Sequence, residues 1–125
     1  MSVRVLVVED DPSVRGLLQT LLSAEGYEVL TASDGLAGLV KAAASPPALV
    51  LLDLMMPDLG GVRVLEQMRE SPELVAIPVV VVTGNVEAVS DMRAVLGQDN
   101  VFLKPFAVGE LLARVGAITG GPDQS

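Results

Sequence analysis

Five short apolar runs alternate along the chain with five longer segments in which apolar residues recur at helical spacing. The runs are rich in valine and leucine and cover residues 3–8, 27–32, 48–52, 79–82 and 101–103. Runs of this length without polar alternation are typical of strands that are buried on both faces of a parallel sheet. The segments after them carry Leu and Val three and four positions apart, which indicates an amphipathic helix after each strand.

This alternation predicts an α/β fold in which a doubly wound, five-stranded parallel sheet lies between two layers of helices. A barrel of eight such units would need about 250 residues, and the chain has 125. We therefore expect a single domain over residues 1–119. Residues 120–125 have the composition of a flexible linker, and we expect them to be a tail or the start of a linker.

The composition excludes several classes of function. The chain has no cysteine and no histidine, so thiol catalysis, a zinc site of the usual kind and a histidine general base are ruled out. The net charge of −8 argues against direct binding of nucleic acid or of an anionic membrane by this domain. Because no apolar run approaches about 18 residues and no leader pattern is present, the cytoplasm is the expected compartment.

Polar side chains follow four of the five predicted strands. Glu9 and Asp10 come after the first strand and Asp53 after the third, while Thr83 follows the fourth and Lys104 the fifth. Because the carboxyl ends of parallel strands meet at one edge of the sheet, we expect these side chains to lie close together. Carboxylates are ligands for a hard divalent cation, and a lysine and a hydroxyl can bind a phosphoryl group.

Each of these residues also has an ordinary structural interpretation. Asp53 could cap a helix or lie on the surface, Thr83 could cap the following helix, and Lys104 could be a surface lysine before a turn proline. We assign Asp11 to helix capping and Asp58 to a solvated loop. Taken one at a time the residues are weak signals, but their occurrence in order at successive strand ends favours a common site.

In this arrangement the chain resembles the receiver domain of two-component response regulators, over roughly residues 3–118. The matching elements, in chain order, are Glu9-Asp10, Asp53 with Met56-Pro57, Thr83-Gly84, and Lys104-Pro105-Phe106. The resemblance implies a flavodoxin-like three-layer sandwich with strand order 2-1-3-4-5, a known property of that family and not a result of the periodicity.

The resemblance implies that Asp53 accepts a phosphoryl group from a histidine kinase or a phosphotransfer protein and becomes an aspartyl phosphate. It also implies the cofactor Mg²⁺, held directly by Asp10, Asp53 and the Met55 carbonyl and by Glu9 through a water. A carboxylate nucleophile needs no deprotonation at neutral pH, so the absence of histidine is no obstacle.

In the family, the lysine and the threonine that match Lys104 and Thr83 contact phosphoryl oxygens, and the bond before the proline that matches Pro105 is cis. The resemblance further implies a phosphorelay switch that acts on an effector protein or on a linked output domain. The chemistry is then limited to phosphorylation and dephosphorylation of the chain itself, so we expect that the chain is not an enzyme acting on a separate substrate.

Two positions depart from the family pattern. Val101 stands three residues before Lys104, where the family usually has Tyr or Phe, and Phe102 lies one residue later. Successive residues of a strand point to opposite faces, so we expect Phe102 not to replace the missing aromatic ring. Gly60 stands where many relatives have an acid, and with Gly61 it indicates a tight turn.

Two other functions are compatible with parts of this pattern. A phosphorylation-independent interaction module on the same fold is favoured by the absence of the aromatic residue, but has no need for the charged residues at the strand ends. A haloacid-dehalogenase-like phosphatase also uses an aspartate and Mg²⁺, but it needs a second aspartate two residues after the first, where this chain has Met55. The charged set therefore favours the phosphorylated switch.

Overall fold

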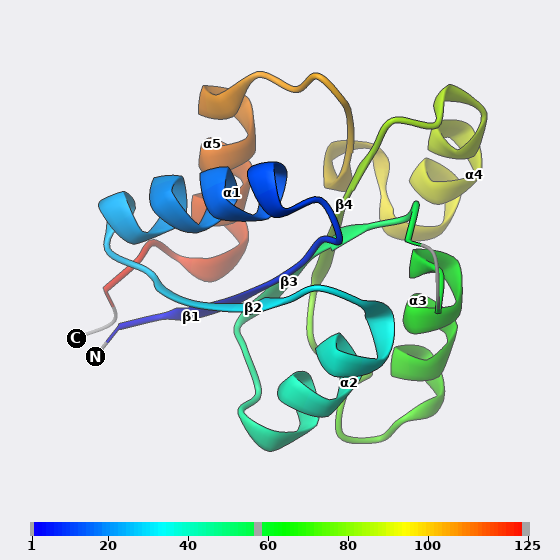
Figure 1. Cartoon of the computed structure of the whole chain (residues 1–125), viewed down its shortest axis with the longest axis horizontal. Helices are drawn as coiled ribbons and strands as arrows, with labels where there is room; N and C mark the ends of the chain where they lie inside the picture. The colour runs from blue at the N-terminus through cyan, green and yellow to red at the C-terminus, as the bar shows by residue number, and fades with distance from the viewer. Residues whose placement is uncertain (1, 57–58, 124–125) are drawn as a thin grey trace.

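The computed structural model describes residues 2–56 and 59–123. Two residues of the predicted third loop, Pro57 and Asp58, lie outside the described residues, and so do the last two residues of the predicted tail. Five parallel strands form one sheet in the order β2-β1-β3-β4-β5 (Figure 1). The α/β fold with strand order 2-1-3-4-5 is therefore confirmed.

The strands and helices alternate as the sequence predicts. The strands are β1 (Arg4–Val8), β2 (Glu28–Ala32), β3 (Leu49–Asp53), β4 (Val79–Thr83) and β5 (Val101–Leu103). The helices are α1 (Pro12–Glu25), α2 (Gly35–Ala44), α3 (Gly61–Glu70), α4 (Val86–Leu96) and α5 (Val108–Thr119). A short 3₁₀ turn, Gln98–Asn100, precedes β5 and was not predicted. The third and fourth strands each extend one residue further than predicted, so Asp53 and Thr83 are strand residues.

Helices cover both faces of the sheet, and each face has its own apolar core. One face is covered by α1 and α5 and the other by α2, α3 and α4 (Figure 1). Along β1, Leu6 and Val8 belong to the second core, whereas Val5 and Val7 belong to the first. The central strands β3 and β4 are buried at every position, because each of their residues lies under one helical layer or the other.

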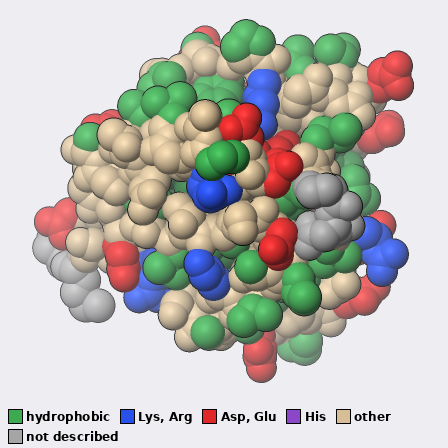
Figure 2. All heavy atoms as spheres, in the orientation of Figure 1, with side chains coloured by type: hydrophobic (Ala, Val, Ile, Leu, Met, Phe, Trp, Pro, Cys, Tyr) green, Lys and Arg blue, Asp and Glu red, His purple; other side chains and the backbone are tan. Residues whose placement is uncertain are grey.

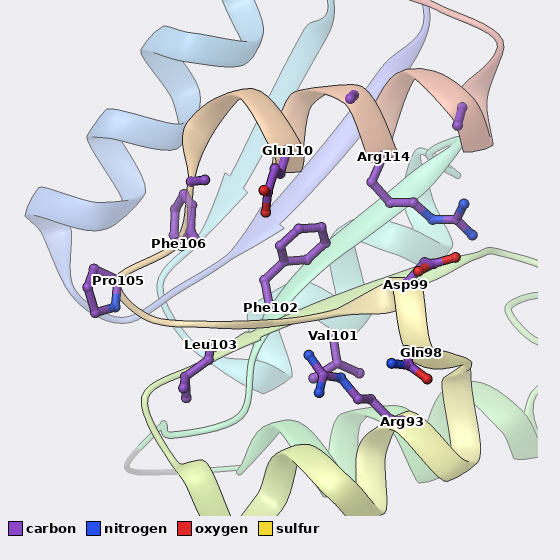
Figure 3. Close-up of a pocket in the computed structure, with 13 residues that line it drawn as sticks. Arg93, Gln98, Asp99, Val101, Phe102, Leu103, Pro105, Phe106, Glu110 and Arg114 are labelled. Atoms are coloured by element: carbon purple, nitrogen blue, oxygen red, sulfur yellow. The ribbon is translucent and has the colours of Figure 1, made fainter.

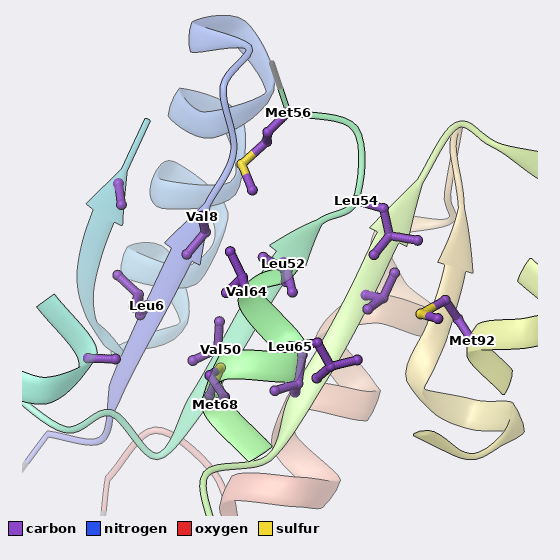
Figure 4. Packing of buried hydrophobic residues seen from close by; sticks show 14 of the residues in the cluster. Leu6, Val8, Val50, Leu52, Leu54, Met56, Val64, Leu65, Met68 and Met92 are labelled. Carbon is purple, nitrogen blue, oxygen red and sulfur yellow. The ribbon is translucent and has the colours of Figure 1, made fainter. Parts of the chain in front are cut away.

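The core on the α3 side reaches the edge of the sheet where the predicted site lies. Figure 4 shows Val64 and Met68 of α3 packed near Val50 of β3, with Met56 at the end of the cluster nearest the loops. Met56 is buried, whereas its neighbour Met55 is 58% exposed. The loop after β3 is thus anchored in the core by Met56, three residues beyond Asp53.

Helix α1 is capped at both ends, and its N-terminal cap is the predicted one. The Asp11 side chain accepts hydrogen bonds from the backbone N–H groups of Ser13 and Val14, at 2.8 and 3.4 Å, at the start of α1. Gly26, with φ of 104°, ends the same helix in the left-handed conformation that favours glycine. The Asp11 cap ends the loop between β1 and α1 within three residues of the sheet, so Glu9 and Asp10 have little backbone freedom.

The two ends of the described chain lie side by side (Figure 1). The Val3 N–H donates a hydrogen bond of 2.9 Å to the Pro122 carbonyl, and Ser2 pairs with Asp123 in an antiparallel bridge. The described part of the predicted tail therefore lies against the beginning of β1. Among the described residues, none of the helices has both the length and the apolar character that crossing a bilayer requires.

Two adjacent leucines of α1 test this packing. Leu18 is 1% exposed and Leu17 is 49% exposed. We expect Leu18→Ala to lower the free energy of unfolding by about 2–5 kcal/mol, because it leaves a cavity between α1 and the sheet. Leu17→Ala should change it by about 0.5 kcal/mol or less. Urea unfolding of the two variants measures both values, and equal losses would contradict the packing.

Candidate functional site

The predicted site residues lie together at the carboxyl edge of the sheet. Asp53 and Thr83 are the last residues of the neighbouring strands β3 and β4, Glu9 directly follows β1, and Lys104 directly follows β5. The Lys104 N–H donates a hydrogen bond of 2.8 Å to the Thr83 carbonyl, which extends the pairing of the strands by one step. Four segments that are distant in sequence therefore contribute to one site, as the strand-end argument predicts.

Three carboxylates form the centre of the site. Glu9, Asp10 and Asp53 each have an oxygen within 4.8 Å of the others. Glu9 and Asp53 are 1% and 3% exposed, whereas Asp10 is half-buried. Carboxylates this close, and largely removed from water, repel one another strongly. The donor set consists only of carboxylate oxygens, which fits a hard divalent cation such as Mg²⁺.

The side chain of Lys104 brings a positive charge next to two of these acids. Its Nζ lies 2.6 Å from Oε1 of Glu9 and 3.6 Å from Oδ2 of Asp53. The ammonium is therefore hydrogen-bonded to Glu9 and lies at a longer ion-pair distance from the predicted nucleophile. Lys104 partly offsets the repulsion among the carboxylates, and it forms its hydrogen bond with Glu9 and not with Asp53.

The titration of this pair reflects burial and mutual attraction. The pKa of Glu9 is raised, first because burial disfavours the charged carboxylate and second because of the neighbouring Asp53; Lys104 opposes both effects. The pKa of Lys104 is also raised, because the depression caused by burial is outweighed by the hydrogen bond with Glu9 and by the charge of Asp53. Neutral pH therefore keeps Lys104 charged beside the acids.

Asp53 is held by its own loop. One oxygen, Oδ1, accepts a hydrogen bond of 3.1 Å from the backbone N–H of Met55. The chain thus turns back over the carboxylate directly after β3. The role of the Met55 carbonyl as a metal ligand stays a prediction.

Thr83 combines the structural role and the site position that the sequence left open. Its side chain is completely buried, and Oγ1 accepts a hydrogen bond of 3.0 Å from the Asn85 N–H. Asn85 in turn caps α4 by accepting from the Glu87 N–H at 3.0 Å. Because the bond to Asn85 uses the hydroxyl as an acceptor, the hydroxyl hydrogen can still be donated to another group.

Gly61 brings the start of α3 against the end of β3. A Cβ atom at Gly61 would lie 2.5 Å from the Asp53 carbonyl oxygen and 2.6 Å from Cα of Leu54. The Gly61 N–H also donates a hydrogen bond of 3.1 Å to the Leu54 carbonyl. Neither Gly60 nor Gly61 has a positive φ. At Gly61 the need for glycine therefore comes from the close approach of two backbone segments and not from a left-handed backbone conformation.

Val101 and Phe102 point to opposite faces of β5, as predicted. Val101 belongs to the core on the α4 side, whereas Phe102 packs on the core on the α5 side (Figure 3). Phe102 lines a groove of about 650 Å³ between β5 and α5, and this groove includes none of the three clustered carboxylates. The position that the family fills with an aromatic ring holds a buried valine.

Arg15 belongs to the site region and was not predicted. Its Nη1 donates hydrogen bonds to the backbone carbonyls of Glu9, at 2.9 Å, and Asp10, at 3.2 Å. Side chains of a helix lean toward its N-terminus, so an arginine one turn into α1 can reach the preceding loop. That position was the available signal. Figure 2 shows acidic side chains close together near the middle of one face, with basic side chains beside them.

Comparison with known proteins identifies this arrangement. The family model described as "Response regulator receiver domain" matches residues 5–116. The chain belongs to this family. It is 40% identical over 119 residues to the alkaline phosphatase synthesis transcriptional regulatory protein PhoP of Bacillus subtilis and 43% identical over 120 residues to the response regulator MprA of Mycobacterium tuberculosis. These matches cover 94% of the chain but only 49% and 51% of the two relatives.

Solved receiver structures have the same fold. A putative response regulator from Chloroflexus aurantiacus superposes with a TM-score of 0.86 at 27% identity, covering 96% of this chain and 99% of that one. The chemotaxis protein CheY4 of Vibrio cholerae superposes with a TM-score of 0.83 at 26% identity, covering 94% of this chain and 99% of that one. The receiver domain therefore accounts for nearly all of this chain, which spans about half the length of the curated relatives it matches.

Adjacent glycines test the packing of the loop after β3. We expect Gly61→Ala to lower the free energy of unfolding by about 1–3 kcal/mol and to reduce phosphorylation at Asp53, because the added methyl group displaces the backbone of that residue. At Gly60, the nearest atom among the described residues to an added Cβ is the Leu54 carbonyl oxygen, at 3.8 Å. Gly60→Ala should therefore leave both quantities close to wild type. Urea unfolding and phosphoryl labelling provide the measurements.

The raised pKa of Glu9 predicts a pH dependence of stability. A group whose pKa is higher in the folded state stabilises the fold fully below its unfolded pKa, near 4.5, and this contribution is lost as the pH rises through the folded value. The free energy of unfolding of Glu9→Gln, minus that of wild type, should therefore increase from pH 4.5 toward neutrality. Urea unfolding across this range measures the difference, with Glu73→Gln as a control for loss of an exposed carboxylate. A difference that stays constant would contradict the assignment.

Proposed function

We propose that the chain is a phosphorelay switch, in which Asp53 accepts a phosphoryl group in a Mg²⁺-dependent reaction. The observation that carries the proposal is the convergence of Glu9, Asp10, Asp53 and Lys104 at one edge of the sheet, in a chain that belongs to the receiver family. The phosphoryl donor is a phosphohistidine on a histidine kinase or on a phosphotransfer protein.

In the proposed reaction, an oxygen of the Asp53 carboxylate attacks the phosphorus of the donor. The bond between phosphorus and the imidazole nitrogen breaks, and its electron pair stays on that nitrogen. Asp53 is suited to this step because Met55 N–H orients one oxygen, at 3.1 Å, while Lys104 remains 3.6 Å from the other.

The carboxylates of Asp10 and Asp53 and the Met55 carbonyl would hold Mg²⁺, with Glu9 acting through a water. The ion, when bound, neutralises charge on the phosphoryl oxygens that the three acids would otherwise repel. Burial of Glu9 and Asp53 keeps competing water away from two of these groups.

Lys104 and Thr83 would carry the signal. Phosphorylation adds about −1.5 to −2 charges at Asp53, which would draw the Lys104 ammonium away from Glu9, its partner at 2.6 Å. The Thr83 hydroxyl would donate to another phosphoryl oxygen, and its bond to the Asn85 N–H joins that movement to the cap of α4. The face formed by α4, β5 and α5 would then differ between the two states.

The signal would pass to an effector protein or to a linked output domain. The relatives of about twice this length include a protein named as a transcriptional regulator, which supports the second route. We further propose that the chain turns over no independent substrate and that its chemistry is confined to its own phosphorylation and dephosphorylation.

A phosphorylation-independent interaction module is the second candidate. It is favoured by Val101, which leaves the usual aromatic ring absent from the position coupled to Thr83. In that case the acidic cluster would serve binding alone, and stable labelling of Asp53 would be absent.

Phosphoryl labelling tests the proposal directly. After incubation with acetyl phosphate and Mg²⁺, we expect the intact mass of wild type to increase by one phosphoryl group and that of Asp53→Asn to stay unchanged. Asp91→Asn, which alters an exposed acid on α4, is the control and should label like wild type. An adduct on Asp53→Asn would refute the assignment of the acceptor, and no adduct on any of the three proteins would favour the interaction module.

A further inference from the structure

Arg15 lies beside the metal site without contacting its carboxylates. It is the fourth residue of α1, and its half-buried side chain folds back toward the loop that carries Glu9 and Asp10. A single guanidinium nitrogen, Nη1, is shared between the carbonyls of these two residues at 2.9 and 3.2 Å. Two successive peptide groups are thereby held by one side chain.

The position is an unfavourable one for a cation in an ordinary helix. The N-terminal turn of a helix carries partial positive charge, so arginine is disfavoured there. The Asp11 carboxylate caps this helix, but the first turn after the cap contains no acid. Within residues 2–56 and 59–123, no carboxylate forms an ion pair with Arg15. The two carbonyls and the field of the nearby acids are therefore its compensating interactions.

In the loop between β1 and α1, Arg15 provides the hydrogen bonds to the carbonyl groups of Glu9 and Asp10. The Glu9 N–H donates to the Ala32 carbonyl at 3.0 Å, and the Asp11 N–H donates to Oε2 of Glu9 at 3.3 Å. In both of these hydrogen bonds the loop contributes a backbone N–H group as the donor. The carbonyls of Glu9 and Asp10 are held by Arg15 instead.

We propose that Arg15 is a positioning residue for the Mg²⁺ site, an inference that rests on the proposed function. By fixing the peptide groups on either side of Asp10, it fixes the direction in which that carboxylate leaves the backbone. Arg15 itself occupies no carboxylate oxygen of Glu9 or Asp10, because it binds only their carbonyls. Its role is thus distinct from that of Lys104, which bonds to a carboxylate directly.

The charge of Arg15 and its geometric support have opposite effects on the affinity for Mg²⁺, so an experiment can separate them. A positive charge near the site repels Mg²⁺, so removing only the charge of Arg15 would tighten metal binding. Removing the geometric support would weaken it. Mg²⁺ requires near-ideal octahedral geometry, whereas Ca²⁺ accepts irregular coordination. A loosened loop should therefore lose affinity for Mg²⁺ more than for Ca²⁺.

The experiment compares wild type with Arg15→Met and Arg15→Lys. Calorimetric titration with Mg²⁺ and, separately, with Ca²⁺ gives the two dissociation constants, and thermal unfolding without metal gives the stability. Arg4→Met is the matched control, because Arg4 also makes two hydrogen bonds, to Glu28 and to the Pro46 carbonyl, but at the opposite edge of the sheet.

We expect Arg15→Met to weaken Mg²⁺ binding about tenfold or more, the range found when an outer residue that orients metal ligands is removed. Its affinity for Ca²⁺ should fall less, and Arg15→Lys should recover part of the loss. Arg4→Met should bind both ions like wild type. If Arg15→Met does not fold, the test is the ratio of the Mg²⁺ and Ca²⁺ dissociation constants of Arg15→Lys. We expect this variant to prefer Mg²⁺ over Ca²⁺ less than wild type does.

Three results are contrary to the proposal, and they are distinguishable. Unchanged or tighter Mg²⁺ binding by Arg15→Met, or an unchanged ratio of the two constants in Arg15→Lys when only that variant folds, would overturn the positioning role. Equal losses for Mg²⁺ and Ca²⁺, together with lower stability, would mean that Arg15 only supports the fold. Failure of wild type itself to bind Mg²⁺ would refute the metal-dependent function on which the inference rests.

Discussion

Repulsion among three carboxylates is the constraint on which the rest of this site depends. Glu9, Asp10 and Asp53 lie within 4.8 Å of one another, and two of them are almost completely buried. Burial alone would favour protonation, and the raised pKa of Glu9 reflects this. Lys104 offsets the repulsion only in part, so a divalent cation has a strong electrostatic reason to bind. Because negative charge is in excess at this site, a change in the charge on Asp53 alters the electrostatic forces on its neighbours.

The site is held in place by close packing of backbone segments and by side chains that bond to the backbone of its loops. Gly61 lets α3 begin against the carbonyl of Asp53, closer than any other residue type would allow. Arg15 and the cap at Asp11 hold the loop after β1. Glu9 and Asp10 thus lie on a short loop between β1 and the capped helix α1, and Asp53 is the last residue of β3, so a backbone shift is opposed by the core on both sides of the sheet.

In the proposed function, the residues for the chemistry and those for the output lie in different parts of the domain. The residues that would bind the metal and the phosphoryl group are all present at the sheet edge, whereas Val101 removes the aromatic ring that relatives use for coupling. Phe102 lies on the other face and lines the groove beside α5. In the proposed switch, the signal from Asp53 would pass to the outer face through Thr83, Asn85 and the start of α4, which two hydrogen bonds connect.

The sequence by itself determined the alternation of strands and helices, the Asp11 cap and the meeting of Glu9, Asp10, Asp53, Thr83 and Lys104 at the strand ends, because parallel strands of an alternating α/β chain must end at one edge of the sheet. It also determined that Val101 and Phe102 face opposite sides, since strand periodicity is local. Only the tertiary structure decided that Lys104 bonds to Glu9 more closely than to Asp53, that Gly61 is needed for close approach, and that Arg15 reaches two loop carbonyls. These features depend on side-chain reach and on how segments cross in space, which no local pattern encodes.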